Sequence, residues 1–395
     1  MSLRPWRPIR AVLIVSGMLR HPLRPHLGPD DLVALYGPEW GERMALTSGR
    51  APDAVFALID RHKIDCAPTR GGFLYVARTR VRLRSIEKLA EEWRQRGVDA
   101  VTLDRPATAA ILGTTAYLGG YFDPRAGTIQ PLSYTRGLAK AALRAGASVF
   151  AGVRAKSLRR NGGRWLIETS QGPMSAPTVI IATNAYTTGL IGRLSRSVLR
   201  IHSVQLATAP IPEEIRRTIL PAEQSCSDNH ADIRYFRWDQ EGRFVLGGPG
   251  WFTPPRTPNS TSFRRLERSL KEMFPQLRTF DVAHRWFGAG ALTLDTIPHL
   301  HEPRPGIFAA LGYNGRGIAL GTVRARGASS ARRSRAHSSV SPNAASHASV
   351  QRRIRTPPHR CGFQSTVWKG QGRDSLGPPL ARKRGACHGQ DRRSA

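Results

Sequence analysis

The fold is decided by residues 306–323, GIFAALGYNGRGIALGTV. The apolar run over residues 306–311 predicts a strand, and the apolar run over residues 318–323 predicts the start of a helix. Between them, the glycines from Gly312 to Gly317 let the backbone approach a ligand closely, and the free amides at the helix start favour an anion or a polarised carbonyl oxygen. The alternative is a glycine-rich turn that only closes the strand–helix unit, and the segment alone does not distinguish the two.

A second candidate segment for ligand binding follows the apolar run over residues 178–182. The run is uninterrupted, which predicts a strand buried on both faces. Ala182, Thr183 and Asn184 stand at its end, and nucleotide cofactors lie at the carboxyl ends of strands in α/β sheets. Taken alone, an ordinary strand-to-helix connection with Asn184 as the helix cap is the stronger interpretation.

The chain ahead of residue 151 alternates helical and extended patterns. Helices are predicted where apolar residues recur at helical spacing, over residues 52–62, 81–96 and 132–145. Strands are predicted over residues 72–77 and 148–150. This βαβ-like rhythm indicates an α/β fold.

The chain from residue 165 to residue 274 has a different pattern. Strands are predicted over residues 165–169, 197–208, 233–238 and 243–248, the last two joined by a hairpin turn at residues 239–242. A helix over residues 262–274 carries its apolar residues on one side, namely Phe263, Leu266, Leu270 and Met273. We expect an antiparallel sheet with a covering helix, mainly residues 197–290, inserted as a second domain into the α/β domain.

Composition and charge describe a folded middle with two basic ends. The 395 residues are 40% hydrophobic and 22% charged, and the formal net charge is +32. Sixteen Lys or Arg and two acidic residues lie in residues 324–395, where the periodicity also ends, and five Arg and no acidic residue lie in residues 1–27. We therefore expect a basic segment over residues 1–27, a folded region over residues 28–323 and a basic, unfolded tail over residues 324–395.

Cysteine usage and hydropathy exclude several classes of protein. The four cysteines are far apart and form no CxxC pair, which argues against a disulfide framework and favours a reducing cytoplasm. No stretch approaches the roughly 20 apolar residues that span a bilayer, so no membrane association is expected. His299 and His301 alternate onto one strand face without a third ligand at a typical spacing, so no metal site is predicted. Asp295, just before a proline turn, is interpreted as a capping residue.

The net charge alone would indicate a protein that binds nucleic acid or another polyanion. The basic runs at residues 332–335, 352–355 and 382–384 are not accompanied by a recognition motif, so specific nucleic-acid binding is not expected. A non-catalytic protein that binds polyanions or nucleic acid nonspecifically through its tail, with a steep salt dependence, is the alternative function.

The order in which the segments occur is more specific than any one of them. The two candidate segments are accompanied by residues 122–131, by Tyr235-Phe236-Arg237 ahead of residues 242–248, and by Trp286-Phe287-Gly288. With all of these segments in this order, the chain from about residue 28 to residue 323 resembles the flavin-dependent amine and amino-acid oxidases of the D-amino-acid oxidase superfamily. Within that superfamily it resembles the gamma-glutamylputrescine oxidoreductase-like branch.

The resemblance implies an FAD-binding Rossmann-like domain interleaved with an antiparallel-sheet substrate domain. It implies oxidation of the C–N bond of an amine or amino acid by hydride transfer to the flavin, which oxygen or another electron acceptor reoxidises. The residues that match the family's cofactor-binding segments are Ala182, Thr183, Asn184, Gly312, Tyr313, Asn314, Gly315, Arg316, Gly317 and Ile318. Those on the substrate-facing sheet are Tyr235, Arg237 and Trp286. Arg237 could hold a carboxylate by a bidentate pair, although an exposed arginine of the hairpin is the commoner case. Such enzymes often need no dedicated acid or base, so no catalytic residue is predicted.

Both ends depart from the family pattern. The family begins with a strand, a GxGxxG turn and a helix, whereas this sequence has no GxGxxG before Gly49 and no acidic residue before Asp30. The helix that starts at Ile318 loses its pattern at Arg324. We hypothesise that both ends are translated in a shifted frame, so that the Rossmann-like domain is incomplete, FAD binding weak and the oxidase impaired. A GxGxxG upstream and an apolar helix downstream, in the other reading frames of the DNA, would support this hypothesis.

Overall fold

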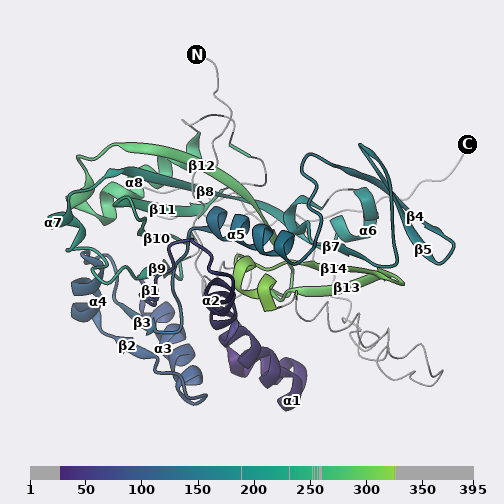
Figure 1. Ribbon diagram of the computed structural model, residues 1–395. Helices are drawn as coiled ribbons and strands as arrows, with labels where there is room; N and C mark the ends of the chain where they lie inside the picture. Colours follow the sequence, from purple (N-terminus) through teal and green to yellow (C-terminus); the bar gives the residue numbers. More distant parts are fainter. Residues whose placement is uncertain are drawn as a thin grey trace, which may run out of the picture. The chain divides into compact units, whose positions relative to one another are not determined.

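The computed structural model describes residues 27–323 and 325, except for residues 188, 231, 251, 253, 256, 258 and 259 (Figure 1). All the described residues belong to one compact unit of the chain. The expected basic segment over residues 1–27 and the expected tail over residues 324–395 lie outside the described residues, apart from residues 27 and 325.

Most strands form one large mixed sheet. Its strands are β1 (Phe73–Ala77), β2 (Val101–Leu103), β3 (Gly119–Asp123), β8 (Leu199–Pro210), β9 (Ser225–Asp228), β10 (Tyr235–Trp238), β11 (Arg243–Pro249) and β12 (Val282–Leu292). Their order in the 8-stranded sheet is β12-β8-β11-β10-β9-β1-β3-β2. The sheet therefore joins strands from residues 73–123 to the strands of the expected substrate domain.

Two smaller sheets accompany the large one. The first contains β13 (His299–Arg304), β14 (Ile307–Leu311) and β7 (Val179–Ile181), in that order. The second contains β4 (Ala155–Asn161), β5 (Arg164–Thr169) and β6 (Gly172–Ala176). Trp165 of β5, Ile181 of β7 and Ile307 of β14 share one apolar cluster, so the two small sheets pack together.

The α-helices are α1 (Pro29–Gly49), α2 (Ala51–His62), α3 (Arg80–Arg94), α4 (Arg105–Leu112), α5 (Pro131–Arg144), α6 (Gly192–Ser195), α7 (Glu213–Arg216) and α8 (Thr261–Met273). Short 3-10 helices are η1 (Asn184–Tyr186), η2 (Gly189–Ile191) and η3 (Pro275–Leu277). Residues 317–323 form a further helix directly after the glycine-rich segment.

The large sheet is covered differently on its two faces (Figure 1). On one face, α8 buries Phe263, Leu266 and Leu270, which recur at helical spacing, against apolar residues of the sheet that include Leu206 and Phe236. Burial of each such side chain stabilises the fold by about 1.5–3 kcal/mol.

On the other face, α3 packs against β1, β2 and β3 at one end of the sheet. Ile86 and Trp93 of α3 contact the cluster that contains Tyr75 and Tyr121. The β8–β12 end of the same face carries the polar residues that are described below as a candidate substrate site.

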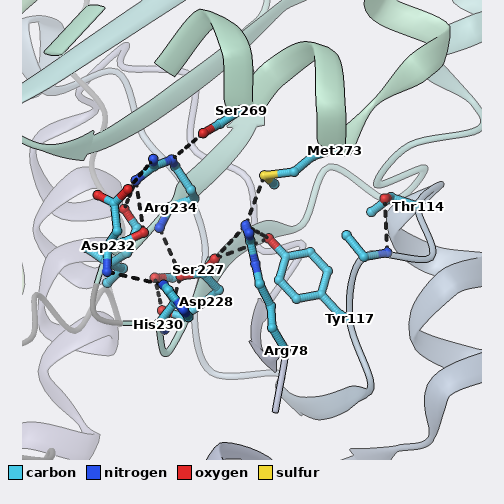
Figure 2. Close-up of polar contacts among 12 residues, drawn as sticks. Arg78, Thr114, Tyr117, Ser227, Asp228, His230, Asp232, Arg234, Ser269 and Met273 are labelled. Atoms are coloured by element: carbon cyan, nitrogen blue, oxygen red, sulfur yellow. Dashed lines mark hydrogen bonds and ion pairs between the residues drawn. The ribbon is translucent and has the colours of Figure 1, made fainter. Parts of the chain in front are cut away.

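A buried ion pair fixes the carboxyl ends of the parallel strands β1 and β9 (Figure 2). The Arg78 Nη2 atom lies 3.0 Å from the Asp228 carboxylate, which is fully buried. Asp228 also accepts hydrogen bonds from the backbone amides of Arg234 (2.9 Å) and His230 (3.3 Å). The Tyr117 hydroxyl donates to Asp228 over 3.4 Å, so one carboxylate connects three segments of the chain, at Arg78, at Tyr117 and over residues 228–234.

Many of the expected elements are confirmed. The helices over residues 52–62, 81–96, 132–145 and 262–274 are present within two residues at each end, as are the strands over 72–77, 165–169 and 306–311. The hairpin at residues 239–242 joins β10 to β11. The mixed α/β fold class is confirmed by the large mixed sheet and its helices.

Three expectations are wrong. Residues 148–150 are not a strand, because they find no partner strand, and Phe150 is 63% exposed. The strand at residues 179–181 is not buried on both faces: it forms the edge of its sheet, and Ile180 is 54% exposed. Within residues 73–123 the βαβ-like rhythm does not give parallel neighbours, because β1 and β3 pair antiparallel; the parallel neighbour of β1 is β9, which lies far along the chain.

Candidate functional site

The two candidate cofactor-binding segments lie together at the carboxyl ends of β7 and β14. These strands pair in parallel, with Ile181 opposite Ala309. The segments that follow the two strands therefore leave the sheet at the same edge. The backbone amide of Gly312 donates a hydrogen bond of 3.1 Å to Asn184 Oδ1. Ala182 and Thr183 are exposed beside this contact.

Asn314 holds the glycine-rich segment against the end of β12. Its Oδ1 atom accepts from the backbone amide of Thr293 (2.9 Å), and its Nδ2 group donates to Thr293 Oγ1 (3.0 Å) and to the carbonyl of Gly312 (2.6 Å). Its side chain is buried and its φ angle is +51°, a value that few residues other than glycine adopt. We infer that Asn314 shapes the segment, because its side-chain polar atoms are already bonded.

The other residues of the segment divide between core and surface. Tyr313 and Ile318 pack against the cluster that α2, α5 and the helix over residues 317–323 form. Gly315 is exposed, and Gly317 begins the helix. A Cβ atom at Gly317 would have its nearest neighbours, in the Tyr313 side chain, 3.9 Å away, so this part of the backbone is accessible.

Arg316 faces a cavity of about 340 Å³ between α1, the loop after β12 and the helix over residues 317–323. Its guanidinium donates to the carbonyl of Thr296 over 3.3 Å, and burial lowers its pKa to about 10. The other polar side chains at the cavity are Arg43, Thr47, Ser48 and Thr296, and none of the described lining residues is acidic. The remaining lining is apolar: Leu27, Leu32, Trp40, Met44, Ile297, Pro298, Leu320 and Val323.

The lining of this cavity suits a ligand that combines negative charge with an apolar body, as FAD does with its phosphates and its ring system. Two arginines offer charge-assisted hydrogen bonds, and two hydroxyl side chains offer further ones. The volume lies at the low end of the range of about 300–1,000 Å³ that is usual for ligand sites. The residues present therefore fit part of an FAD molecule.

The candidate substrate residues lie on one face of the large sheet. Tyr235 of β10 is paired with Gly247 of β11, and Gly247 is paired with Gln205 of β8. Gln205 is in turn paired with Trp286 of β12. These four residues form one row across four strands, on the face opposite α8. Arg237 lies on the same face, because it follows Tyr235 by two positions.

Tyr235 lies flat across its neighbour strand. Its ring occupies the space above Gly247, and its hydroxyl forms hydrogen bonds with Ser203 Oγ and with the carbonyl of Gly248. Burial raises the pKa of Tyr235 to about 12, although the bond with Ser203 opposes this. The hydroxyl therefore stays protonated at neutral pH.

Arg237 is not an exposed hairpin arginine, because it is only 5% exposed. Its Nη1 group donates to the carbonyl of Trp238 over 2.7 Å, and its Nε atom has no hydrogen-bond partner among the described residues. Burial lowers its pKa to about 10, with a smaller opposing effect of Asp239. A cavity of only about 30 Å³ borders it, beside Thr69 and Glu223.

Sequence reasoning missed Ser203, Gln205 and the residues of α1. The alternation along residues 199–210 places Ser203 and Gln205 on the same strand face, which is a signal that could have been used. Their positions next to Tyr235 and Trp286 depend on strand register, which a local sequence pattern does not predict.

Asp295 takes the capping role that was expected. It accepts from the backbone amide of Ile297 (3.1 Å) and bonds to His299 Nε2 (2.7 Å). Burial raises the pKa of this carboxyl, but the hydrogen bonds from His299 and Ile297 outweigh burial, so the pKa lies below its usual value. In the described part of the chain, no group of three or more His, Cys, Asp or Glu side chains could hold a metal ion.

Among the helices that the structure describes, none combines the length and the apolar character needed to cross a bilayer.

The G247A variant is expected to lose about 1–3 kcal/mol of unfolding free energy, because the new methyl group overlaps the Tyr235 ring. Thermal and urea unfolding measure this loss. G288A is the matched control, because a Cβ at Gly288 of the same sheet meets no atom within 4 Å. Equal stability of the two variants would contradict the described position of Tyr235.

Comparison with known proteins gives consistent matches. The family model described as "DAO: FAD dependent oxidoreductase" matches residues 16–330. The chain is 28% identical over 304 residues to the probable oxidoreductase OrdL of Rhizobium meliloti, covering 74% of this chain and 67% of that protein. It is 28% identical over 262 residues to gamma-glutamylputrescine oxidoreductase of Escherichia coli, covering 66% of this chain and 61% of that protein. The chain thus spans about two thirds of the length of these relatives.

Solved structures show the same fold. Glycine oxidase from Geobacillus kaustophilus superimposes with a TM-score of 0.62 at 20% identity, over 71% of this chain and 76% of that chain. L-proline dehydrogenase from P. horikoshii superimposes with a TM-score of 0.62 at 17% identity, over 78% of this chain and 79% of that chain.

Proposed function

Because the chain belongs to the DAO family of FAD-dependent oxidoreductases, we propose that it oxidises the C–N bond of an amine or an amino acid. The observation that carries this proposal is the contact of Asn184 with Gly312, at the start of the same glycine-rich segment whose Arg316 borders the cavity of about 340 Å³. The names of two similar proteins point to the same substrates, since one is a gamma-glutamylputrescine oxidoreductase and the other a glycine oxidase.

FAD, when bound, would accept a hydride, and with it two electrons, from the carbon next to the substrate nitrogen. We propose that Arg316 offers positive charge to this group and that Asn184 and Asn314 hold the backbone around it. Arg43, Thr47 and Ser48 would add polar contacts from α1.

For the substrate, we propose the sheet face that carries Tyr235, Arg237 and Trp286. A protonated Tyr235 hydroxyl cannot act as a base at neutral pH, and its one proton is already donated to the Gly248 carbonyl. Arg237 keeps its charge at neutral pH and has one unpartnered N–H, so it could bind an anionic substrate group if the small cavity beside it opens. No acid or base is assigned.

Flavin content tests the proposal. The purified full-length chain is expected to bind FAD when FAD is added in excess, and then to oxidise amines or amino acids. Since no GxGxxG stands before Gly49, we expect weak binding, with most of the FAD lost during purification. The absorption spectrum, with FAD measured after denaturation, checks both points. A chain that neither binds added FAD nor oxidises amines would contradict the proposed function.

R316M is expected to weaken FAD binding by about tenfold, since one charge-assisted hydrogen bond is lost. Quenching of FAD fluorescence in a titration measures the affinity. R304M is the matched control, because Arg304 is exposed at the end of β13. If R316M binds FAD as tightly as R304M does, Arg316 has no role in holding the cofactor.

The alternative function, nonspecific polyanion binding, rests on residues 324–395, which lie outside the described residues apart from residue 325. Binding to duplex DNA at a series of salt concentrations would test it.

A further inference from the structure

Two buried polar side chains on the candidate substrate face lack hydrogen-bond partners among the described residues. These are Gln205, whose Oε1 atom is unpartnered, and Trp286, whose Nε1 group is unpartnered. Gln205 is 9% exposed and Trp286 is 6% exposed. They stand directly opposite each other on β8 and β12, so their Cβ atoms are about 4.5–5.5 Å apart. An unpartnered acceptor and an unpartnered donor, side by side, require an explanation because each costs free energy.

There is room beside this pair. Gly288 follows Trp286 by two positions on the same strand face, and a Cβ atom there would meet nothing within 4 Å. Gly290, two positions further, has only Ile201 within that distance. Because neither position carries a side chain, there is open space over this stretch of β12, which we call the hollow.

Fixed walls border the hollow. Ser203, which stands opposite Gly288, forms a hydrogen bond with the Tyr235 hydroxyl and so holds that ring in place. The Tyr186 hydroxyl accepts a hydrogen bond of 3.3 Å from the backbone amide of Ala289. Tyr186 belongs to η1, which begins at the cofactor-segment residue Asn184, so this contact connects the hollow to the candidate cofactor site.

We propose that Gln205 and Trp286 bind an amide group carried by the substrate, and this inference rests on the proposed function. Trp286 Nε1 would donate to the amide carbonyl, and Gln205 Oε1 would accept from the amide N–H.

Other groups match the pair less well. A carboxylate would accept from Trp286 but would place an oxygen against the oxygen of Gln205. An ester lacks the N–H that Gln205 needs. The side chains around the hollow, those of Ser203 and Tyr235, are neutral, so a neutral ligand group is buried there at lower cost than a charged one.

Three ligands that differ in one group test the inference: glycinamide, glycine methyl ester and glycine. Isothermal titration calorimetry on the full chain with excess FAD measures their affinities without requiring turnover. Glycinamide is expected to bind about tenfold more tightly than the ester, because only the amide satisfies Gln205. Glycine is expected to bind more weakly than glycinamide.

Variants of Gln205 and Trp286 test whether these two residues cause the preference for the amide over the ester. Q205L is expected to abolish the preference for glycinamide over the ester, whereas Q205E, which keeps an oxygen acceptor, is expected to retain it. W286F is expected to weaken the amide and the ester alike, since both accept from the indole. Q171L, at an exposed turn, is the matched control and should behave as the parent protein does.

A steric variant tests the hollow itself. G288L is expected to abolish binding of all three ligands while the melting temperature stays unchanged. Tightest binding of glycine, equal binding of amide and ester, or no binding of glycinamide would each overturn the inference. A protein that discriminates the ligands but oxidises no amine contradicts only the proposed function, and one that oxidises amines without discriminating them contradicts only this inference.

Discussion

The R78M variant is expected to lose about 3–5 kcal/mol of unfolding free energy at neutral pH. The carboxylate of Asp228 is fully buried, and Arg78 is its ion-pair partner at 3.0 Å. Removing the guanidinium leaves a buried negative charge with only hydrogen bonds from Tyr117 and from the amides of Arg234 and His230. Urea unfolding measures the loss.

The same variant should show a characteristic pH dependence. Burial raises the pKa of Asp228 above its usual value, and the nearby charge of Arg78 opposes that rise. The Asp228 pKa is therefore higher in the folded than in the unfolded chain, and removing Arg78 raises the folded value further. A group of this kind loses its stabilising contribution as the pH rises through the folded pKa. The defect of R78M is thus expected to grow as the pH rises from the usual carboxyl range toward neutrality, because the charged form of Asp228 becomes populated in that interval.

Two further variants serve as controls for this prediction. R80M changes an exposed arginine at the start of α3 and is expected to alter stability by less than about 0.5 kcal/mol. The double variant R78M/D228N removes both charges and is expected to recover part of the loss. If R78M is as stable as R80M, or if its defect shrinks with rising pH, the ion pair does not stabilise the fold.

The N314A variant is expected to lose about 2–4 kcal/mol of unfolding free energy and to weaken FAD binding by more than tenfold. Without the side-chain amide, the backbone N–H of Thr293 and the carbonyl of Gly312 lose their partners, and each costs about 1–3 kcal/mol if it stays buried. The glycine-rich segment then keeps only the backbone hydrogen bond from the residue-314 amide to the Ala291 carbonyl as its link to β12, so Arg316, two residues further on, is held less firmly. Urea unfolding and fluorescence titration with FAD measure the two effects.

Two other substitutions at residue 314 separate the effect of the lost hydrogen bonds from the effect of the backbone conformation. N314G removes the hydrogen bonds but suits the φ angle of +51°, so it isolates the contribution of the hydrogen bonds. N314D keeps the acceptor for the Thr293 amide and loses only the two donated bonds, so an intermediate loss is expected. An N314A variant with the stability and FAD affinity of the parent protein would show that Asn314 does not hold the segment.

The sequence by itself determined the elements whose patterns are local. Helix α8 follows from apolar residues at helical spacing, and β14 with its glycine-rich segment follows from one apolar run and the residues after it. The family followed from the order of such segments, which the matching family model confirms. Each segment's pattern lies within a few neighbouring residues, so the segment can be recognised without knowing which other part of the chain it contacts.

Only the tertiary structure decided which residues meet. The contact of Asn184 with Gly312 and the alignment of Gln205 with Trp286 each join segments far apart in the chain. The burial of Arg237 and the exposure of Ile180 likewise depend on what packs above each strand. Local periodicity predicts which face of a strand is apolar. Which residues pack against that face depends on strand register and on long-range packing. The candidate substrate site consists of such neighbours, and for this reason its residue types could be predicted from the sequence but their arrangement could not.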